Sequence, residues 1–314
     1  MRVVVAGAGG VGALLGGLLA RAGEEVGFLS RGAQLRALRE GGLTVDSPRG
    51  RFHLPAVEAA DDPARLGRAE VVLVSVKSWQ VEELAPRLAP LILPDGFAVP
   101  LENGVEAWEI LARALGAERV VGGLCHLFSF LEGPGRVKHT GERLEVTLGE
   151  RRGGSSPRVE SFARRLRAAR IDAVVSEDIE AALWTKFAFI APFGGVGAVT
   201  RAPVGELRAM PETRALLRSA IDEVVAVARA RGVKLPADTA SGVLAMIDAL
   251  SPETTASMQR DLMAGRPSEL ADQNGAVVRL GAALGVPVPA NAFLLAALVP
   301  QERAARRSQA RPPG

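Results

Sequence analysis

Lys186 is the residue best suited to proton transfer, because its neighbours are mostly apolar. It stands in the segment 183–190 (LWTKFAFI), which has the composition of a largely buried helix. Burial disfavours the charged ammonium and so favours release of its proton near neutral pH. Only four of the 38 basic residues are lysines, which suggests that those present are needed as amines. The structural alternative is a lysine whose stem packs on apolar neighbours while its ammonium reaches water.

Further polar candidates follow in the second half of the chain. Glu269 comes after Pro267 and Ser268, at a position where a helix dipole favours an acid. Ser257 and Asp261 also fit ordinary helix-start and surface positions. Taken alone, these residues are compatible with either a structural or a functional role.

Two polar residues are expected at the carboxyl edge of a sheet. Lys77 follows the apolar run 71–76, and Asn103 follows the apolar run 97–101 in the sequence LENG. Doubly wound folds bind their ligands at this edge, so both side chains are candidates for ligand contacts. The structural alternatives are a surface lysine and an Asn-Gly turn.

A glycine motif that binds dinucleotides begins directly after the first apolar run. It matches G-x-G-x-x-G at Gly7, Ala8, Gly9, Gly10, Val11 and Gly12. An amphipathic helix follows it and a second strand ends about 20 residues later, as this βαβ motif requires. The three motif glycines allow a tight turn, close approach to a pyrophosphate and close helix packing, in that order. The helix N-terminus would hold the phosphates.

The residues at the end of the second predicted strand favour NADP as the cofactor. A carboxylate at this position binds the ribose 2′-hydroxyl of NAD, whereas here the chain reads Leu29-Ser30-Arg31-Gly32. A hydroxyl followed by a guanidinium suits a 2′-phosphate. The alternative for Arg31 is a solvated loop residue in an arginine-rich chain.

The pattern of apolar runs predicts an α/β fold, with an N-terminal Rossmann-type doubly wound sheet and a C-terminal all-helical domain. In the first half, apolar runs without alternation are separated by helical segments, which is typical of a parallel sheet covered on both faces. The predicted strands are 2–6, 26–29, 71–76, 97–101 and 120–130. The predicted helices between them are 11–22, 33–40, 80–91 and 107–115.

The domain boundary is expected near Glu177, where the periodicity becomes helical. Residues 136–139 and 143–148 resemble an antiparallel pair, followed by a helix that ends near 169 and a last strand at 172–175. Beyond them, the predicted helices are 215–231, 240–250, 258–263 and 269–284. We therefore expect a dinucleotide-binding domain at 1–177 and a helical substrate and dimerisation domain at 178–314.

Composition excludes several other classes of protein. The formal net charge of +3 equals that of the tail 302–314, and no aromatic residue interleaves with its arginines, so we expect a solvated, frayed end and no nucleic-acid partner. Cys125 is the single cysteine and, with His126, fits the core of a strand. The sequence predicts no metal site, no membrane partner and a cytoplasmic location.

Over almost its full length, the chain resembles the ketopantoate reductase (2-dehydropantoate 2-reductase) family. The resemblance rests on the glycine motif with Arg31, on KSWQ at 77–80, ENG at 102–104, WTK at 184–186, Ser257-Met258 with Asp261, and Ser268-Glu269 near Asn274-Gly275. It implies reduction of ketopantoate to pantoate by NADPH, in the pathway to pantothenate and coenzyme A. It also implies a homodimer.

The resemblance assigns roles to the candidate residues. Lys186 would be the general acid that protonates the carbonyl oxygen, and Glu269 would bind a substrate hydroxyl and orient Lys186. Asn103 and Lys77 would line the nicotinamide side, and Ser257 would hold the substrate carboxylate. Hydride addition builds negative charge on the oxygen, so a positioned proton donor is required.

One departure from the family concerns the substrate. Characterised members carry asparagines four and eight residues after the lysine, where this chain has Ile190 and Gly194. Loss of polar contacts in a pocket changes which substrate it selects, so reduction of a different small 2-oxo acid is the main alternative. A non-catalytic NADP-binding sensor on the same fold is the second alternative.

Overall fold

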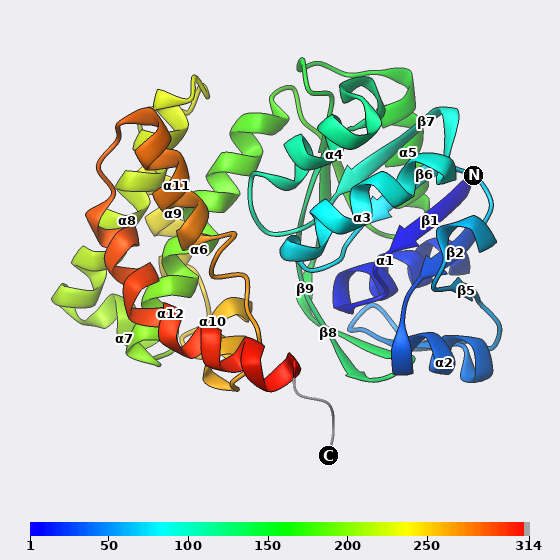
Figure 1. Ribbon diagram of the computed structural model, residues 1–314, viewed down its shortest axis with the longest axis horizontal. Helices are drawn as coiled ribbons and strands as arrows, with labels where there is room; N and C mark the ends of the chain where they lie inside the picture. Colours follow the sequence, from blue (N-terminus) through cyan, green and yellow to red (C-terminus); the bar gives the residue numbers. More distant parts are fainter. Residues whose placement is uncertain (311–314) are drawn as a thin grey trace. The chain divides into compact units, whose positions relative to one another are not determined.

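The computed structural model describes residues 1–310, and the chain divides into two compact units. The first comprises Met1–Glu102 and Ala107–Ile179, and the second comprises Asn103–Glu106 and the chain from Glu180 onward. Figure 1 follows the chain by colour from the blue β1 to the red α12. The short segment Asn103–Glu106 thus belongs with the helices, although residues on both sides of it belong to the first unit.

A parallel sheet forms the centre of the first unit, as the sequence predicts, but one of its five strands, Glu58–Ala60, was not predicted. Its strand order is β5-β2-β1-β6-β7, and every neighbouring pair is parallel. The strands are β1 (Arg2–Ala6), β2 (Glu25–Leu29), β5 (Glu58–Ala60), β6 (Ala69–Val74) and β7 (Ile92–Pro100). The connecting helices are α1 (Gly10–Arg21), α2 (Gly32–Gly41), α3 (Val81–Leu88) and α4 (Ala107–Leu115). All carboxyl ends therefore lie at one edge of this sheet.

A second sheet in this unit was not expected from the sequence. It has the order β10-β9-β3-β4, with β8 paired to β9. Its strands are β3 (Leu43–Asp46), β4 (Phe52–Leu54), β8 (Gly122–Gly133), β9 (Arg136–Gly149) and β10 (Asp172–Val175). The prediction that 120–130 joins the first sheet is wrong except for a single bridge between Val120 and Ala98. Helix α1 contacts β1 and β2 as well as β8 and β9, so one buried core serves both sheets.

The predicted antiparallel pair at 136–139 and 143–148 is wrong, because both segments belong to the single strand β9. Its antiparallel partner is β8, and the register jumps between the pairs Leu127–Leu144 and Phe128–Thr140. The residues between Thr140 and Leu144 therefore bulge out of the ladder, and Gly141 has a φ of +76°. A glycine within a short polar stretch has the sequence pattern of a turn.

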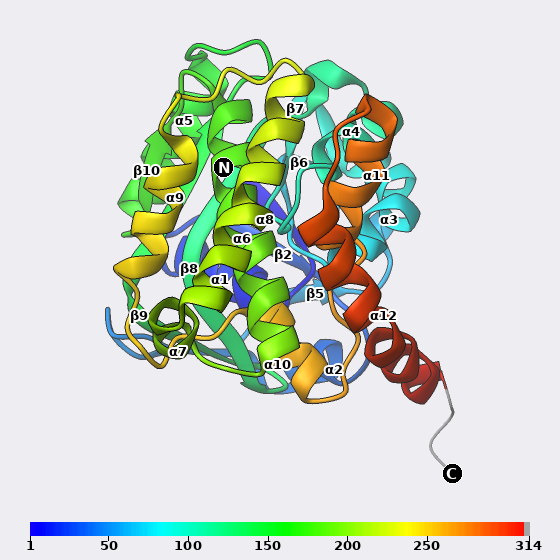
Figure 2. The ribbon, with the colours of Figure 1, turned by 90° about the vertical axis from the view of Figure 1, so that its left-hand side faces the viewer.

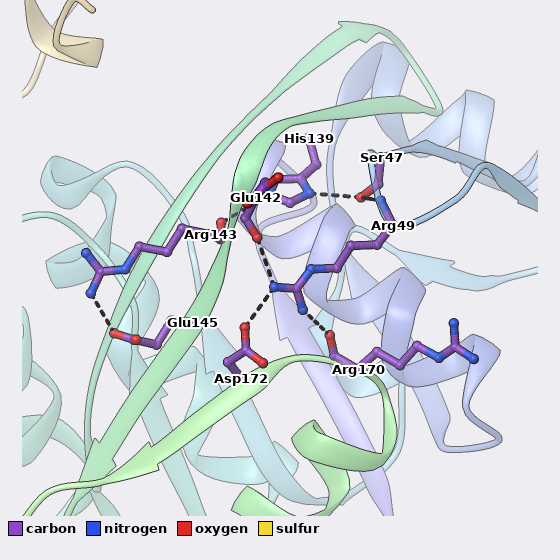
Figure 3. Close-up of polar contacts among 8 residues, drawn as sticks. All are labelled: Ser47, Arg49, His139, Glu142, Arg143, Glu145, Arg170 and Asp172. Atoms are coloured by element: carbon purple, nitrogen blue, oxygen red, sulfur yellow. Dashed lines mark hydrogen bonds and ion pairs between the residues drawn. The ribbon is translucent and has the colours of Figure 1, made fainter. Parts of the chain in front are cut away.

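A polar cluster fixes the middle of β9 (Figure 3). The buried ring of His139 contacts Ser47 Oγ through Nδ1 at 2.9 Å and the carbonyl oxygen of Arg143 through Nε2 at 3.2 Å. Arg49 donates to the carbonyl oxygens of Arg170 and Glu142 and to Asp172. Burial and the Arg49 charge lower the pKa of His139, although its bond to the Arg143 carbonyl acts in the opposite direction.

The second unit is all-helical, as predicted. Its helices are α6 (Ile179–Thr200), α7 (Val204–Ala209), α8 (Pro211–Ala230), α9 (Thr239–Asp248), α10 (Ser257–Met263), α11 (Asn274–Leu284) and α12 (Pro289–Ala310). Figures 1 and 2 show α8, α11 and α12 side by side. Helix α6 alone among the described helices is long and apolar enough to span a membrane, and 72% of that stretch is buried inside the protein.

Helix α11 begins later than the predicted start at Glu269. Residues 269–273 form turns, in which the amides of Asp272 and Gln273 donate to the Glu269 carbonyl oxygen. Helical backbone begins only at Asn274. Glu269 therefore lies in a bend before the helix and not in its first turn.

The expectation of a frayed C-terminus is wrong up to Ala310, because α12 continues to that residue. Glu302 is only 6% exposed and accepts hydrogen bonds from Ser268 N at 2.9 Å and Ser268 Oγ at 2.6 Å. Arg306 donates to Glu302 at 2.6 Å and to the Ser268 carbonyl oxygen. These contacts hold Glu302 and Arg306 in the fold, whereas Arg303 and Arg307 are exposed, as expected, and Arg311 lies outside the described residues.

Candidate functional site

The glycine motif forms a tight turn between β1 and α1. Gly7 has a φ of +106°, and a Cβ there would lie 2.8 Å from the Ser75 backbone. A Cβ at Gly12 would lie against the Gly7 carbonyl oxygen and 2.8 Å from Val5 Cγ1. Ser75 Oγ donates to the Gly7 carbonyl oxygen at 2.8 Å and holds the turn to the end of β6. Only glycine therefore fits these two positions.

The N-terminus of α1 leaves room for an anion. No side chain caps this 12-residue helix at Gly9, and a Cβ at Gly9 would meet nothing within 4 Å. The first amides of a helix lack partners within the helix and attract phosphate groups. Ala8 is buried, and its carbonyl oxygen accepts from Gln34 Nε2 at 3.0 Å, which holds the turn from the α2 side. Val11 packs against the core of the unit.

A pocket of about 270 Å³ opens at the carboxyl ends of the strands in the first unit. Its lining residues come from the end of β2, from the turns after β1, β2, β5 and β6, from α2, α3 and the 3₁₀ turn Ser78–Gln80, and from β8. They are Gly7, Ala8, Gly9, Leu29, Ser30, Arg31, Gln34, Asp61, Val76, Gln80, Glu83, Leu84 and Leu131. The glycine turn and the second-strand residues therefore face one cavity, in an arrangement that fits a dinucleotide.

Arg31 lies at the N-cap of α2, separated from β2 by Ser30, and its side chain is 61% exposed. Its guanidinium lies 3.9 Å from Glu83 on α3. Ser30 is 9% exposed, and its amide donates to the Ala60 carbonyl oxygen at the end of β5. Among these pocket residues, the end of β2 carries a hydroxyl and a guanidinium and no carboxylate.

Lys77 is exposed at the carboxyl edge of the same sheet, where it caps the short 3₁₀ turn Ser78–Gln80. Its amide donates to Gln80 Oε1 at 3.2 Å, and its ammonium lies 5.8 Å from the centroid of the Trp79 ring. Gln80 lines the pocket. The structure therefore places Lys77 beside the pocket, among residues that reach into it.

Lys186 lies on α6 in the second unit and is 8% exposed. Trp184 and Phe187 beside it pack edge to face, with ring centroids 5.6 Å apart. Within the residues that the structure describes, the Lys186 ammonium takes part in no hydrogen bond or ion pair. An ammonium on such a largely buried side chain is suited to a ligand that offers it a hydrogen-bond partner.

Glu269 is also buried in the second unit, at 5% exposure. Asn103 Nδ2 donates to Glu269 Oε2 at 3.4 Å, and Gln273 Nε2 reaches the same oxygen at 3.5 Å. The structure thus brings together Asn103 and Glu269, which lie 166 residues apart in the chain. Glu106 and Arg279 form an ion pair of 2.6 Å that ties the Asn103 segment to α11.

The remaining predicted substrate residues surround a crowded part of the second unit. Ser257 is exposed and begins α10, and Ile190 is half-buried on α6. Gly194 is buried, and a Cβ there would lie 2.9 Å from Met258 Cε and 3.4 Å from Gln273 Oε1. The space beside Gly194 is therefore filled by Met258 and Gln273.

Several residues of these sites were missed from the sequence. Gln273 contacts Glu269, Glu302 holds Ser268, and Gln34 spans the Ala8 carbonyl oxygen and the Gly135 amide. No spacing rule predicts such contacts, because each joins segments distant in sequence or at an unpredicted turn. Cys125 is buried in the core, as predicted, and His126 pairs with Glu145. Over residues 1–310, no cluster of three histidine, cysteine or acidic residues suits a metal.

The first unit has a parallel sheet, a glycine turn and an adjoining pocket, and the helical unit has a buried lysine and a buried glutamate. These are features of the class of two-domain dinucleotide-binding oxidoreductases. Models of the family "Ketopantoate reductase PanE/ApbA" match residues 3–153 and, for its C-terminal part, residues 178–302. The chain belongs to this ketopantoate reductase family.

Relatives of the chain support this assignment. It is 31% identical over 294 residues to a 2-dehydropantoate 2-reductase of Archaeoglobus fulgidus, covering 94% of this chain and 95% of that protein. A ketopantoate reductase family structure from Ralstonia eutropha superposes with a TM-score of 0.89 and 32% identity, covering 98% and 100% of the two chains. A D-mandelate dehydrogenase structure with NADH and anilino(oxo)acetate has a TM-score of 0.88 at 23% identity, covers 98% and 99%, and shows the shared fold alone.

Proposed function

We propose that this protein reduces ketopantoate to pantoate with NADPH, a step that leads to pantothenate and coenzyme A. The observation that carries this proposal is the burial of Lys186 on α6, in a chain of this family. Bound NADPH would supply the hydride to the carbonyl carbon. Lys186 would give its proton to the carbonyl oxygen, so that a ketone becomes a secondary alcohol and the lysine is left neutral.

The other residues would hold the substrate around this proton transfer. Glu269 would accept a hydrogen bond from a substrate hydroxyl and help orient Lys186. Asn103 would hold the Glu269 carboxylate in place through its 3.4 Å hydrogen bond. Ser257 is exposed at the start of α10 and would donate to the substrate carboxylate. Such fixed polar groups lower the barrier by positioning the reacting atoms.

Several features of the first unit support NADPH as the cofactor. The glycine turn and the free amides of α1 suit the pyrophosphate, and Arg31 at the pocket wall suits a 2′-phosphate. Lys77 stands beside the pocket and would line its nicotinamide side. By family resemblance, the protein would act as a homodimer through its helical unit, which light scattering can check.

The test is the oxidation of NADPH in the presence of ketopantoate, followed by the absorbance of the reduced nicotinamide. It is measured for the wild type and for Lys186→Ala. We expect turnover in the wild type, and a loss of at least about 10²-fold in kcat in the variant. The variant should bind NADPH as the wild type does, because Lys186 lies outside the nucleotide pocket. Equal turnover in the two proteins would contradict the proposed role.

A second candidate function is reduction of another small 2-oxo acid. Ile190 and the Gly194–Met258 packing favour it, because they present apolar groups where a hydroxylated substrate would need hydrogen-bond donors. A panel of 2-oxo acids with apolar side chains, assayed beside ketopantoate, distinguishes the two. A non-catalytic sensor would bind NADPH and reduce none of them.

A further inference from the structure

Among the described residues that line it, the nucleotide pocket carries two acidic side chains and one arginine. Arg31 follows β2, Asp61 follows the neighbouring strand β5, and Glu83 stands on α3. Strands β2 and β5 pair as far as Leu29 and Ala60, so Arg31 and Asp61 leave the sheet at adjacent positions. The charged lining residues therefore sum to one positive and two negative charges.

Each acid has its own arginine neighbour. Glu83 Oε1 lies 3.9 Å from the Arg31 guanidinium, with the two side chains 76% and 61% exposed. Asp61 Oδ1 lies 4.0 Å from Arg39, which lies outside the pocket lining. Glu83 is thus the carboxylate nearest to contact with Arg31, while Asp61 lies at a similar distance from Arg39.

We propose that Glu83 determines cofactor selectivity by competing with the 2′-phosphate of NADPH for Arg31. This inference rests on the proposed function in that the pocket binds NADPH with its 2′-phosphate at Arg31. A 2′-phosphate that contacts Arg31 must displace the Glu83 carboxylate and is also repelled by the negative charge of Glu83. A neutral 2′-hydroxyl has neither free-energy cost. Glu83 therefore weakens NADPH binding and leaves NADH binding nearly unchanged.

Helix stability alone gives another reason for an acid at this position. Glu82 and Glu83 both stand in the first turn of α3, where the helix dipole favours negative charge. Glu82 is also exposed but does not line the pocket. A purely structural role predicts the same small effect from neutralising either residue, so Glu82→Gln is a matched control with the same change in net charge.

The experiment measures dissociation constants of NADPH and NADH by nucleotide fluorescence for wild type, Glu83→Gln and Glu82→Gln. An exposed pair of this kind is worth up to about fivefold in affinity, so we expect Glu83→Gln to bind NADPH about two- to fivefold more tightly. Its NADH affinity should stay within about 1.5-fold of wild type, and the gain should shrink at high salt. Glu82→Gln should bind both nucleotides as wild type does.

Arg31→Gln provides the second test, because it removes the group for which Glu83 and the phosphate compete. In this background, Glu83→Gln should improve NADPH binding less than in the wild type. Equal gains for NADPH and NADH, an equal gain from Glu82→Gln, or no gain at all would overturn the inference. Failure of the wild type to bind either nucleotide would instead refute the proposed cofactor, and with it this inference.

Discussion

Gly9 and Gly12 belong to the same turn, but Gly12 is tightly packed and Gly9 faces open space. Substitutions at the two positions should therefore affect folding and nucleotide binding differently. A Cβ at Gly12 would press on the Gly7 carbonyl oxygen and on Val5, whereas a Cβ at Gly9 would meet nothing within 4 Å. We expect Gly12→Ala to lower the free energy of unfolding by about 1–3 kcal/mol, because the tightly packed turn cannot relax freely. Urea denaturation measures this change.

Gly9→Ala should behave differently, since its new methyl group fills only the space over the helix N-terminus. We expect an unfolding free energy within about 0.5 kcal/mol of wild type. NADPH affinity should fall by at least about tenfold, because the methyl group keeps the pyrophosphate from the α1 amides. Unchanged nucleotide binding in a folded Gly9→Ala protein would show that the phosphates lie elsewhere.

Both glycines could be identified from the sequence, while the acidic neighbours of Arg31 could not. The motif has a fixed spacing between one strand and one helix, so local rules suffice. Glu83 and Asp61 reach the pocket through the pairing of β2 with β5 and the placement of α3, which depend on tertiary structure. The same limit explains why Gln273 was missed beside Glu269.

At the scale of elements, β9 depends on a buried histidine whose protonation state is coupled to folding. The pKa of His139 is lowered in the folded chain by burial, so below its ordinary value of about 6.5 the unfolded chain binds more protons. Its contribution to stability is therefore complete above pH 6.5 or so and is lost as pH falls toward the lowered folded value.

The measurement is the unfolding free energy from pH 8 down to about pH 5, compared between wild type and His139→Gln. We expect a steeper loss in the wild type, because the variant lacks the titrating ring. His53→Gln is the control, since His53 is exposed and contacts Thr44 on the edge strand pair. A wild-type curve parallel to that of His139→Gln would contradict the assignment.

Helix α12 holds the loop that carries Glu269, so its C-terminal part should affect activity. We expect Glu302→Ala to lower the free energy of unfolding by about 2–4 kcal/mol. The substitution removes two buried hydrogen bonds from Ser268 and the carboxylate that pairs with Arg306. On the proposed function, kcat should also fall, since Glu269 follows Ser268 directly. Glu223→Ala is a matched control, because Glu223 caps the opposite end of α12 at Ala290 and Asn291. It should lower stability and leave kcat near the wild-type value.

The predictions for α12 and β9 from the sequence were wrong for related physical reasons. Four arginines near a chain end have the composition of a solvated tail, yet one buried glutamate that bonds a distant serine makes the helix part of the fold. A three-residue bulge with glycine has the composition of a turn, yet the continuous partner strand β8 keeps β9 in one ladder. In both cases a nonlocal partner outweighs local propensity.

At the scale of the whole molecule, the two units have separate apolar cores. One cluster includes Val3, Leu14 and Phe162 of the first unit, and another includes Trp184, Leu217 and Leu294 of the second. Chains with two cores depart from a single cooperative unfolding transition, because each core can unfold as a unit of its own. We therefore expect two calorimetric transitions, which a ligand of only one unit can tell apart.

NADPH should raise the transition of the first unit selectively, because the glycine turn and all pocket residues belong to it. At 100 times the dissociation constant, binding to the folded state adds about 2.7 kcal/mol to the stability of that unit. Scanning calorimetry with and without NADPH measures the shift, and Gly9→Ala should abolish it at the same nucleotide concentration. The segment Asn103–Glu106 lies between β7 and α4 in the chain but belongs to the second unit. Its contacts there are Glu106–Arg279 and Asn103–Glu269. Equal shifts of both transitions with NADPH would contradict this prediction, and Arg279→Gln would then test whether the segment Asn103–Glu106 transmits the effect.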